Sequence, residues 1–221
     1  MKKMICILLV LAALIMSGFS YFSVESDEEK AFNIEDLYDY QKEFQAEEIS
    51  VCSTNTAKTY MDYHMTTAVS SRQYQFLNYE CTVDENTGFL YDEDGFIAVA
   101  LGSYYGEIGD RYYFTLDSGI VLPLVKAEEK ADVDTDANNC YHTIDGSVIE
   151  FVIDADYARG YFWCNDNGYV LNGNYNNHPL FNGCISKVEK VLEEKAENIV
   201  SYTYDNNIPT NTDIFNYASG Y

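Results

Sequence analysis

Basic residues are scarce in this chain, which has 13 lysines and arginines against 36 aspartates and glutamates and a formal net charge of −23. Such a negative field repels phosphate groups, so neither nucleic acid nor an anionic lipid surface is an expected partner. Proline is also rare, with 3 residues, whereas tyrosine is abundant, with 21. This balance is typical of strands with one wet face rather than of a disordered coil.

Histidine is scarce as well, and the cysteines are far apart. The chain has 3 histidines and 6 cysteines, and no two cysteines form a C-x-x-C pair, so no zinc site and no other cofactor is expected. Cys6 lies in an apolar N-terminal run. The cysteines outside that run are Cys52, Cys81, Cys140, Cys164 and Cys184. Their number is odd, so an exported domain must leave a thiol free or pair it with another chain. Buried cysteines with one disulfide are the favoured interpretation, and a nucleophilic pair of Cys140 with His142 is the alternative.

The N-terminus has the layout of a secretory signal peptide. Two lysines precede an almost uninterrupted apolar run, Met4–Met16, and the small residues Gly18 and Ser20 follow it. Counted to Phe22, the run approaches the roughly 20 residues that span a bilayer. Residues 1–23 are therefore predicted to be either a cleaved signal peptide or a retained membrane anchor. Either way, the protein is expected outside the cytoplasmic membrane, which it would contact only through this segment.

The rest of the chain divides by composition into four parts. They are an acidic stalk or helix (24–50), an aromatic and polar lead-in (51–95), a β-domain (96–200) and a polar C-terminal tail (201–221). The lead-in is rich in aromatic side chains, namely Tyr60, Tyr63, Tyr74, Phe76 and Tyr79. Packing on the β-domain is the favoured interpretation of these rings, and a groove for sugars is the functional alternative.

The β-domain opens with three apolar β-type runs, Phe96–Leu101, Tyr112–Val125 and Val148–Ile153, separated by Gly, Asp and Asn clusters. These runs predict an all-β core, because none of them has helical periodicity. Asp117-Ser118-Gly119 interrupts the second run and predicts a three-residue hairpin loop. Pro123 cannot donate to a strand ladder, so the strand that contains it should be an edge or be bulged there.

Two carboxylates are predicted to share one face of the third run. Strand alternation places Glu150, Val152 and Asp154 on one side of the strand, opposite an acidic loop that includes Glu128. Like charges or partial burial would keep one acid protonated, as a general acid for glycosidic bond cleavage must be. Asp132–Asp136 has the alternating carboxylates of a calcium loop but lacks the glycine and the closing glutamate of that motif. No metal site is therefore expected.

The segment 96–154 resembles the three-aspartate (3D) domains of exported Gram-positive cell-wall proteins and of a murein lytic transglycosylase. Ile97–Ala100 matches their opening strand, Gly109–Leu116 the next strand, Val125–Glu128 the segment that carries A-E-D-T-G, and Ile149–Asp154 the closing I-D-x-x-F-D. Rare lipoprotein A is a more distant relative, and the whole chain is similar to exported proteins of low-GC Gram-positive bacteria.

That resemblance implies a small six-stranded double-psi β-barrel with peripheral aromatic-rich extensions. It also implies that Glu128, Glu150 and Asp154 occupy the three acidic positions, although two of the three aspartates are replaced by glutamate. The first functional hypothesis is a lytic transglycosylase that uses these carboxyl groups on peptidoglycan. The alternative is a non-catalytic β-barrel that binds cell-wall glycan or a partner protein.

Overall fold

The computed structural model describes residues 32–165, 170 and 173–195. The predicted signal or anchor segment and the predicted C-terminal tail lie outside the described residues. The strands are β1 (Phe44–Ile49), β2 (Thr59–Asp62), β3 (Thr82–Val83), β4 (Leu90–Tyr91), β5 (Ile97–Leu101), β6 (Arg111–Leu116), β7 (Val121–Glu129), β8 (Glu150–Ile153) and β9 (Ile185–Lys195). The helices are α2 (Arg72–Tyr79), α3 (Ala155–Ala158), the π-helix η5 (Arg159–Asn165) and six 3-10 turns: η1 (Ile34–Asp39), η2 (Tyr63–Met65), η3 (Ser103–Tyr105), η4 (Asp132–Asp134), η6 (Tyr175–Asn177) and η7 (Pro179–Phe181).

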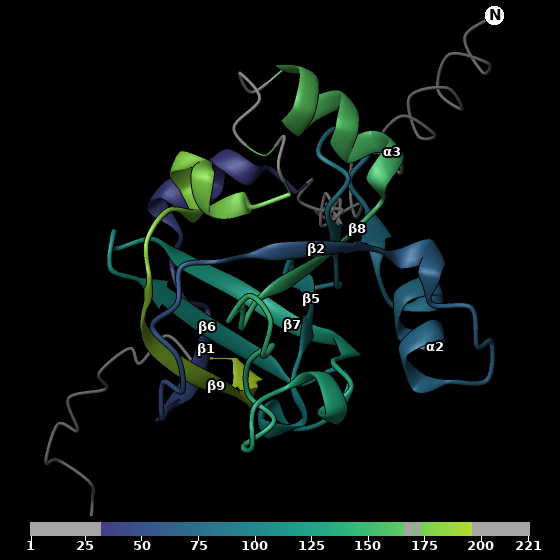
Figure 1. Ribbon diagram of the computed structural model, residues 1–221. Coiled ribbons are helices and arrows are strands. Elements are labelled where there is room, and N and C mark those ends of the chain that lie inside the picture. Colours follow the sequence, from purple (N-terminus) through teal and green to yellow (C-terminus); the bar gives the residue numbers. More distant parts are fainter. Residues whose placement is uncertain (1–31, 166–169, 171–172, 196–221) are drawn as a thin grey trace, which may run out of the picture. The chain divides into compact units, whose positions relative to one another are not determined.

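The described strands form one nine-stranded sheet in the order β1-β9-β6-β7-β5-β4-β3, to which β8 is joined through β5 and β2 through β8 (Figure 1). The prediction of a mainly β fold is confirmed. The prediction of a closed six-stranded barrel is wrong, because the sheet is open and has more strands. The sheet also branches at β5, where β4 pairs at Ile97 and β8 pairs at Val99 and Ala100 on the same edge.

Residues 44–49, within the segment predicted as a stalk or helix, form β1, which pairs antiparallel with β9. The predicted hairpin loop is confirmed: Leu116 and Ile120 are hydrogen-bonded across it, and Gly119 adopts a positive φ of 91°. Pro123 opposes Tyr113 of β6. The pairing of β7 with β5 begins only one residue later, at Leu124, so the missing N–H of Pro123 falls where β7 has no neighbour on its second edge.

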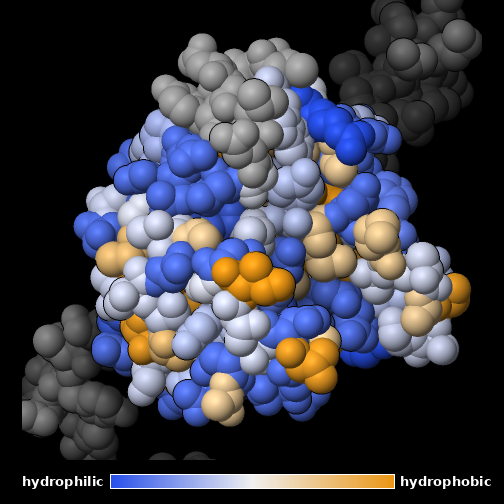
Figure 2. Space-filling model, viewed as in Figure 1, coloured by the Kyte–Doolittle hydropathy of each residue, from blue (hydrophilic) through white to orange (hydrophobic). Residues whose placement is uncertain are grey.

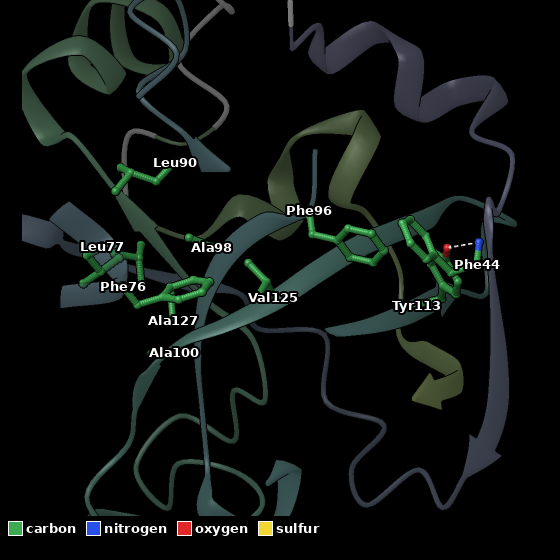
Figure 3. Close-up of a cluster of buried hydrophobic side chains, with 11 residues drawn as sticks. Phe44, Phe76, Leu77, Leu90, Phe96, Ala98, Ala100, Tyr113, Val125 and Ala127 are labelled. Carbon is green, nitrogen blue, oxygen red and sulfur yellow. Dashed lines mark hydrogen bonds between the residues drawn. The ribbon is translucent and has the colours of Figure 1, made fainter. Parts of the chain in front are cut away.

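β5 is buried on both sides, and all of its residues are at most 1% exposed. The even-numbered Ala98 and Ala100 belong to a buried cluster with Phe76 and Leu77 of α2, here termed the alanine face (Figure 3). Its other members are Phe44, Leu90, Phe96, Tyr113, Val125, Ala127 and Val152. The odd-numbered Val99 pairs with Phe151 and points to the opposite face of the sheet. A central strand with two covered faces reads as a continuous apolar run, which is how Ile97–Leu101 reads.

The opposite side, here termed the aromatic face, is filled by rings. Phe151 of β8 lies 5.0 Å, between ring centroids, from both Tyr175 and Phe181. Phe89 and Phe162 complete the cluster at 5.4 Å from each other. These are the tilted and edge-to-face arrangements that aromatic side chains prefer. Every ring of this cluster is fully buried, so this side of the sheet is a packed core.

Candidate functional site

Glu128 and Glu150 flank one alanine. Ala100 of β5 is the register partner of Glu150 on β8 and of Glu128 on β7. Directly opposed residues of neighbouring strands point to the same face, so both carboxylates stand on the alanine face with only a methyl group between them. Two strand spacings separate their Cα atoms by about 10 Å, a span that two glutamate side chains can close toward each other.

A β-bulge in β7 places Glu128 opposite Ala100, so that Glu128, Ala100 and Glu150 form a row across three strands. Val99 pairs with Lys126, but the next residue, Ala100, pairs with Glu128, so the register slips by one residue. In an unbulged strand Ala127 would oppose Ala100, and Glu128 would fall beyond the row. Bulges commonly re-aim side chains in this way beside functional sites.

Glu128 is half-buried, and its surroundings favour the protonated acid. Burial raises the pKa of Glu128, and the charges of Glu129 and Glu150 raise it further. Thr66 opposes this rise, because its hydroxyl donates a hydrogen bond to Oε2 of Glu128 at 3.3 Å. The site therefore holds one carboxyl group with a raised pKa next to a second carboxylate on the same face, the arrangement that acid catalysis by paired carboxyl groups needs.

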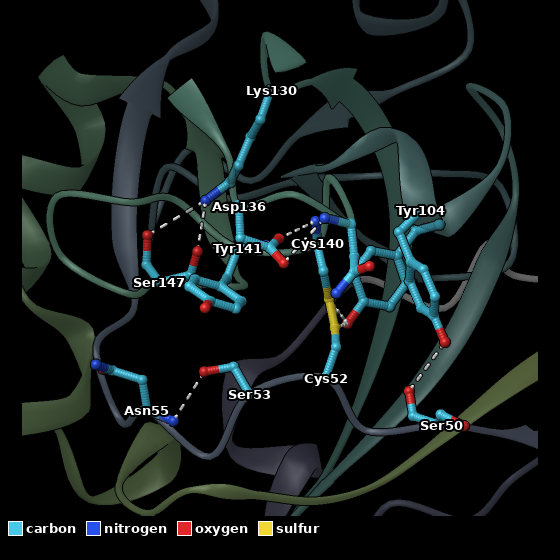
Figure 4. The surroundings of a disulfide bond; sticks show 12 residues. Ser50, Cys52, Ser53, Asn55, Tyr104, Lys130, Asp136, Cys140, Tyr141 and Ser147 are labelled. Atoms are coloured by element: carbon cyan, nitrogen blue, oxygen red, sulfur yellow. Dashed lines mark hydrogen bonds between the residues drawn. A yellow bond between two sulfur atoms is a disulfide. The ribbon is translucent and has the colours of Figure 1, made fainter. Parts of the chain in front are cut away.

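A buried lysine lies beside the Glu150 end of the row. Lys130, which is 7% exposed, donates from Nζ to the carbonyl oxygen of Ser147 at 3.0 Å and to its Oγ at 3.2 Å (Figure 4). Burial lowers the pKa of Lys130, whereas the charges of Glu150 and Asp145 oppose that change. Lys130 thus closes the neck of the loop 131–147 and contributes a positive charge near Glu150.

Asp154 is not part of this row. It lies beyond the end of β8, where its side chain caps α3 by accepting from the N–H groups of Asp156 and Tyr157 at 3.0 and 3.3 Å. Its own N–H donates to the carbonyl of Gly88 at 2.7 Å. Four residues of strand separate it from Glu150, about 13 Å. The structure thus brings Glu128 and Glu150 together and uses Asp154 as a helix cap.

Cys140 is bonded to Cys52, with Cα atoms 6.4 Å apart (Figure 4). The hydroxyl of Tyr105 lies 3.1 Å from Sγ of Cys52 and 3.4 Å from Sγ of Cys140. Because a disulfide has no thiol proton, the hydroxyl is the donor. The alternative of a nucleophilic pair of Cys140 with His142 is therefore wrong. Cys81 and Cys184 are free thiols of the described residues.

The lead-in aromatics divide between packing and exposure. Phe76 is buried in the alanine face, and the ring of Tyr60 lies 5.4 Å from that of Trp163. Tyr63 packs against the alanine face and lies 4.0 Å from the ring of His64 in a tilted arrangement, whereas Tyr79 is 73% exposed. Packing is thus confirmed for Phe76, Tyr60 and Tyr63, whereas Tyr79 is largely exposed beside the ring of Tyr74.

The acidic segment 132–136 is used internally. Asp136 accepts hydrogen bonds from the N–H groups of Asn138, Cys140 and Tyr141, and Asp132 accepts from the hydroxyl of Ser103. In the described part of the chain, no group of three or more His, Cys, Asp and Glu side chains could hold a metal ion.

The two residues that sequence reasoning missed at this site are Thr66 and Lys130. Thr66 is separated from Glu128 by 62 positions, and no local pattern joins the two. Lys130 could have been noticed, because a lysine directly after a buried β-run must bury its stem or leave the strand.

No helix within residues 32–165, 170 and 173–195 is long and apolar enough to cross a membrane. The surface seen in Figure 2 is mostly hydrophilic, with small separate hydrophobic patches. Comparisons with protein-family models, curated proteins and solved structures find no match to this chain.

Proposed function

We propose that this protein is an exported cell-wall protein that cleaves glycosidic bonds of peptidoglycan as a lytic transglycosylase, with Glu128 as the general acid. The observation that carries the proposal is the pairing of Ala100 with both Glu128 and Glu150. It sets two carboxyl groups on one sheet face, of which Glu128 has a raised pKa.

In the proposed reaction, the protonated carboxyl of Glu128 donates its proton to the glycosidic oxygen as the bond to the anomeric carbon breaks. The 6-hydroxyl oxygen of the same sugar bonds to that carbon and closes a 1,6-anhydro ring. The hydroxyl proton passes to the carboxylate pair, which restores the starting protonation state. Glu150 stabilises the positive charge that develops on the sugar ring. A positioned general acid contributes about 10²–10⁴ in rate.

Three of the four matched motif segments, those that begin at Ile97, Val125 and Ile149, support this assignment. They form β5, β7 and β8, and β5 is hydrogen-bonded to each of the other two. The resemblance to the three-aspartate domains implied catalytic roles for Glu128, Glu150 and Asp154 together. The proposal keeps the first two and gives Asp154 a positioning role, because its carboxylate oxygen is occupied as a cap. Export rests on the signal-like layout of residues 1–23.

The experiment is incubation of the purified protein with Gram-positive peptidoglycan and mass spectrometry of the released material. Wild type should release anhydromuropeptides. Glu128→Gln should reduce release by about 10²–10⁴, Glu150→Gln should reduce it less, and Asp154→Asn should preserve it, because asparagine also caps helices well. Release of products without the anhydro ring would contradict the proposed chemistry, and full activity of Glu128→Gln would contradict the assignment of the acid.

The alternative is a module that binds wall glycan without cleaving it. Exposed tyrosine rings favour it, since Tyr79 is 73% and Tyr157 is 40% exposed, and sugars stack on such faces. Co-sedimentation with peptidoglycan without any release, lost in Tyr79→Ala but not in Glu128→Gln, would replace the enzyme by this module.

A further inference from the structure

We propose that a second site, distinct from the pair Glu128 and Glu150, binds a short zwitterionic peptide end that carries a free amine and a free carboxylate. The site is a cavity of about 370 Å³. It is lined by Arg72 and Gln73 of α2, by Glu107 and Ile108 of the β5–β6 connection, and by Glu129 at the end of β7. This volume lies at the lower end of the range for small-molecule sites and suits a dipeptide-sized ligand.

Two walls of the cavity are fixed by one buried ammonium. Lys126 is fully buried, and its Nζ donates to Oε2 of Glu129 at 2.8 Å, to the carbonyl of Gly106 at 2.5 Å and to the carbonyl of Gly102 at 3.2 Å. The three N–H groups of the ammonium are thereby used. Lys126 thus ties the loop that carries Glu107 to the strand that carries Glu129, so the backbone at Glu107 and the carboxylate of Glu129 are positioned before any ligand arrives.

The third wall is held by a separate ion pair. The guanidinium of Arg72 forms a bidentate pair with Glu80, with Nη2 and Oε2 at 3.0 Å, and lies over the ring of Phe76 at 5.1 Å. A guanidinium has five N–H donors in a planar fork. The pair with Glu80 uses two of them, which leaves three to donate to a ligand carboxylate or carbonyl.

The charges of the lining define the ligand. The opposite charges of Lys126 and Glu129 neutralise each other, as do those of Arg72 and Glu80. Within the described residues, the carboxylate of Glu107 has neither an ion-pair nor a hydrogen-bond partner, whereas its backbone N–H and carbonyl are both hydrogen-bonded to Asp110. An amine cation fits between Glu107 and Glu129, a carboxylate fits at Arg72 and Gln73, and Ile108 provides an apolar contact between them. Anionic ligands without an amine are repelled by the two glutamates.

This inference does not rest on Glu128 acting as an acid, and it is tested by binding alone. The probes are the dipeptide alanyl-alanine, its N-acetyl form and its C-terminal amide, each titrated into ¹⁵N-labelled protein and followed by NMR. Alanyl-alanine should shift the amide signals of residues 72–73, 107–108 and 129. The N-acetyl form and the amide should each bind about tenfold more weakly, the loss expected for one charged hydrogen bond.

Two variants assign the ends of the ligand. Glu107→Gln should weaken alanyl-alanine binding about tenfold and should not weaken binding of the N-acetyl form, which has no amine for Glu107 to bind. Arg72→Lys, which loses the planar fork but keeps the charge, should weaken binding of the free acid and leave that of the amide unchanged. Glu93→Gln, an exposed glutamate in another turn, is the matched control and should bind as wild type does.

Glu128→Gln should also bind alanyl-alanine like wild type. A result that contradicts the proposed enzymatic activity therefore does not contradict this binding site, and a result that contradicts the binding site does not contradict the proposed activity. Equal affinity of wild type for alanyl-alanine and its N-acetyl form would overturn the proposal. So would the absence of shifts at the lining residues, or a loss of binding in Glu93→Gln equal to that in Glu107→Gln.

Discussion

On β8, two neighbouring side chains point into different surroundings. Phe151 faces the aromatic side and lies 5.0 Å from the rings of Tyr175 and Phe181, whereas Glu150 faces the alanine side and shares Ala100 with Glu128. The aromatic face buries large rings. The alanine face also buries rings, but the residues beside Glu128 and Glu150 are the small Ala100 and Ala127, which leave room for carboxylates. One face thus supplies stability, and the other can hold groups that would destabilise a tightly packed core.

The largest expected effect is loss of the disulfide, which lies outside both side-chain clusters and contacts Tyr105. Cys52 and Cys140 close a loop with a sequence separation of 88 residues, and the chain-entropy account of such a loop gives about 4–5 kcal/mol. Cys52→Ser with Cys140→Ser should lower the free energy of unfolding by up to that amount, as measured by urea denaturation. The reduced wild type should follow the double variant. An unchanged midpoint in both would show that this link does not stabilise the fold.

A ring deletion compares the two faces directly. Phe151→Ala should cost about 3–5 kcal/mol, because it removes a fully buried ring with a close-packed neighbourhood. Val152→Ala, the next residue on the same strand but on the alanine face, should cost about 2 kcal/mol for two methyl groups. Urea unfolding of both variants measures the difference. Equal losses would mean that the two faces contribute equally to the free energy of unfolding.

A smaller effect is expected at the third carboxylate, which belongs to neither face. Asp154→Ala removes the side-chain cap of α3 and should cost about 0.5–2 kcal/mol, whereas Asp154→Asn keeps an acceptor and should cost little. Thermal unfolding of the two variants tests this. If asparagine were as damaging as alanine, the negative charge of Asp154 rather than its capping bonds would be what the fold needs.

How far the sequence could predict these features depends on how local their causes are. Alternation along 148–154 correctly placed Glu150 and Val152 on the sheet face opposite to that of Phe151. The residues Asp117-Ser118-Gly119 correctly predicted a hairpin loop. The row of Glu128, Ala100 and Glu150 depends instead on a bulge at Ala127 and on the pairing of β5 with β7 and with β8. These strands are distant in sequence, so no local pattern predicts their register. Strand spacing also could not show that Asp154 lies past the end of β8, where capping replaces catalysis.

The barrel was predicted from a resemblance over segment 96–154, and it failed because residues outside that segment complete the sheet. β1 and β9 extend the sheet at one end, and their register joins residues 44–49 to residues near the end of the described chain. Acidic side chains on 24–50 favoured a stalk, yet Phe44 is buried in the alanine face. The charged residues on the exposed face of β1 dominate its composition, so the apolar side that packs on the sheet was not recognised.

The smallest expected effect is a pH dependence that belongs to Glu128. Burial raises its pKa above the ordinary value of 4.5, so the folded protein keeps this proton at pH values at which the unfolded chain has lost it. The contribution of Glu128 to stability is therefore fully present below 4.5 and is lost as the pH rises through the raised pKa. Glu128→Gln removes this change, so its free energy of unfolding relative to wild type should be constant at low pH and should increase across that window. Urea unfolding at several pH values measures it, with Glu93→Gln as the control. If Glu128→Gln instead became less stable relative to wild type as the pH rises, the ionised carboxylate would be the form that the fold prefers. Glu128 would then be unsuited to hold the proton that an acid on the alanine face must donate.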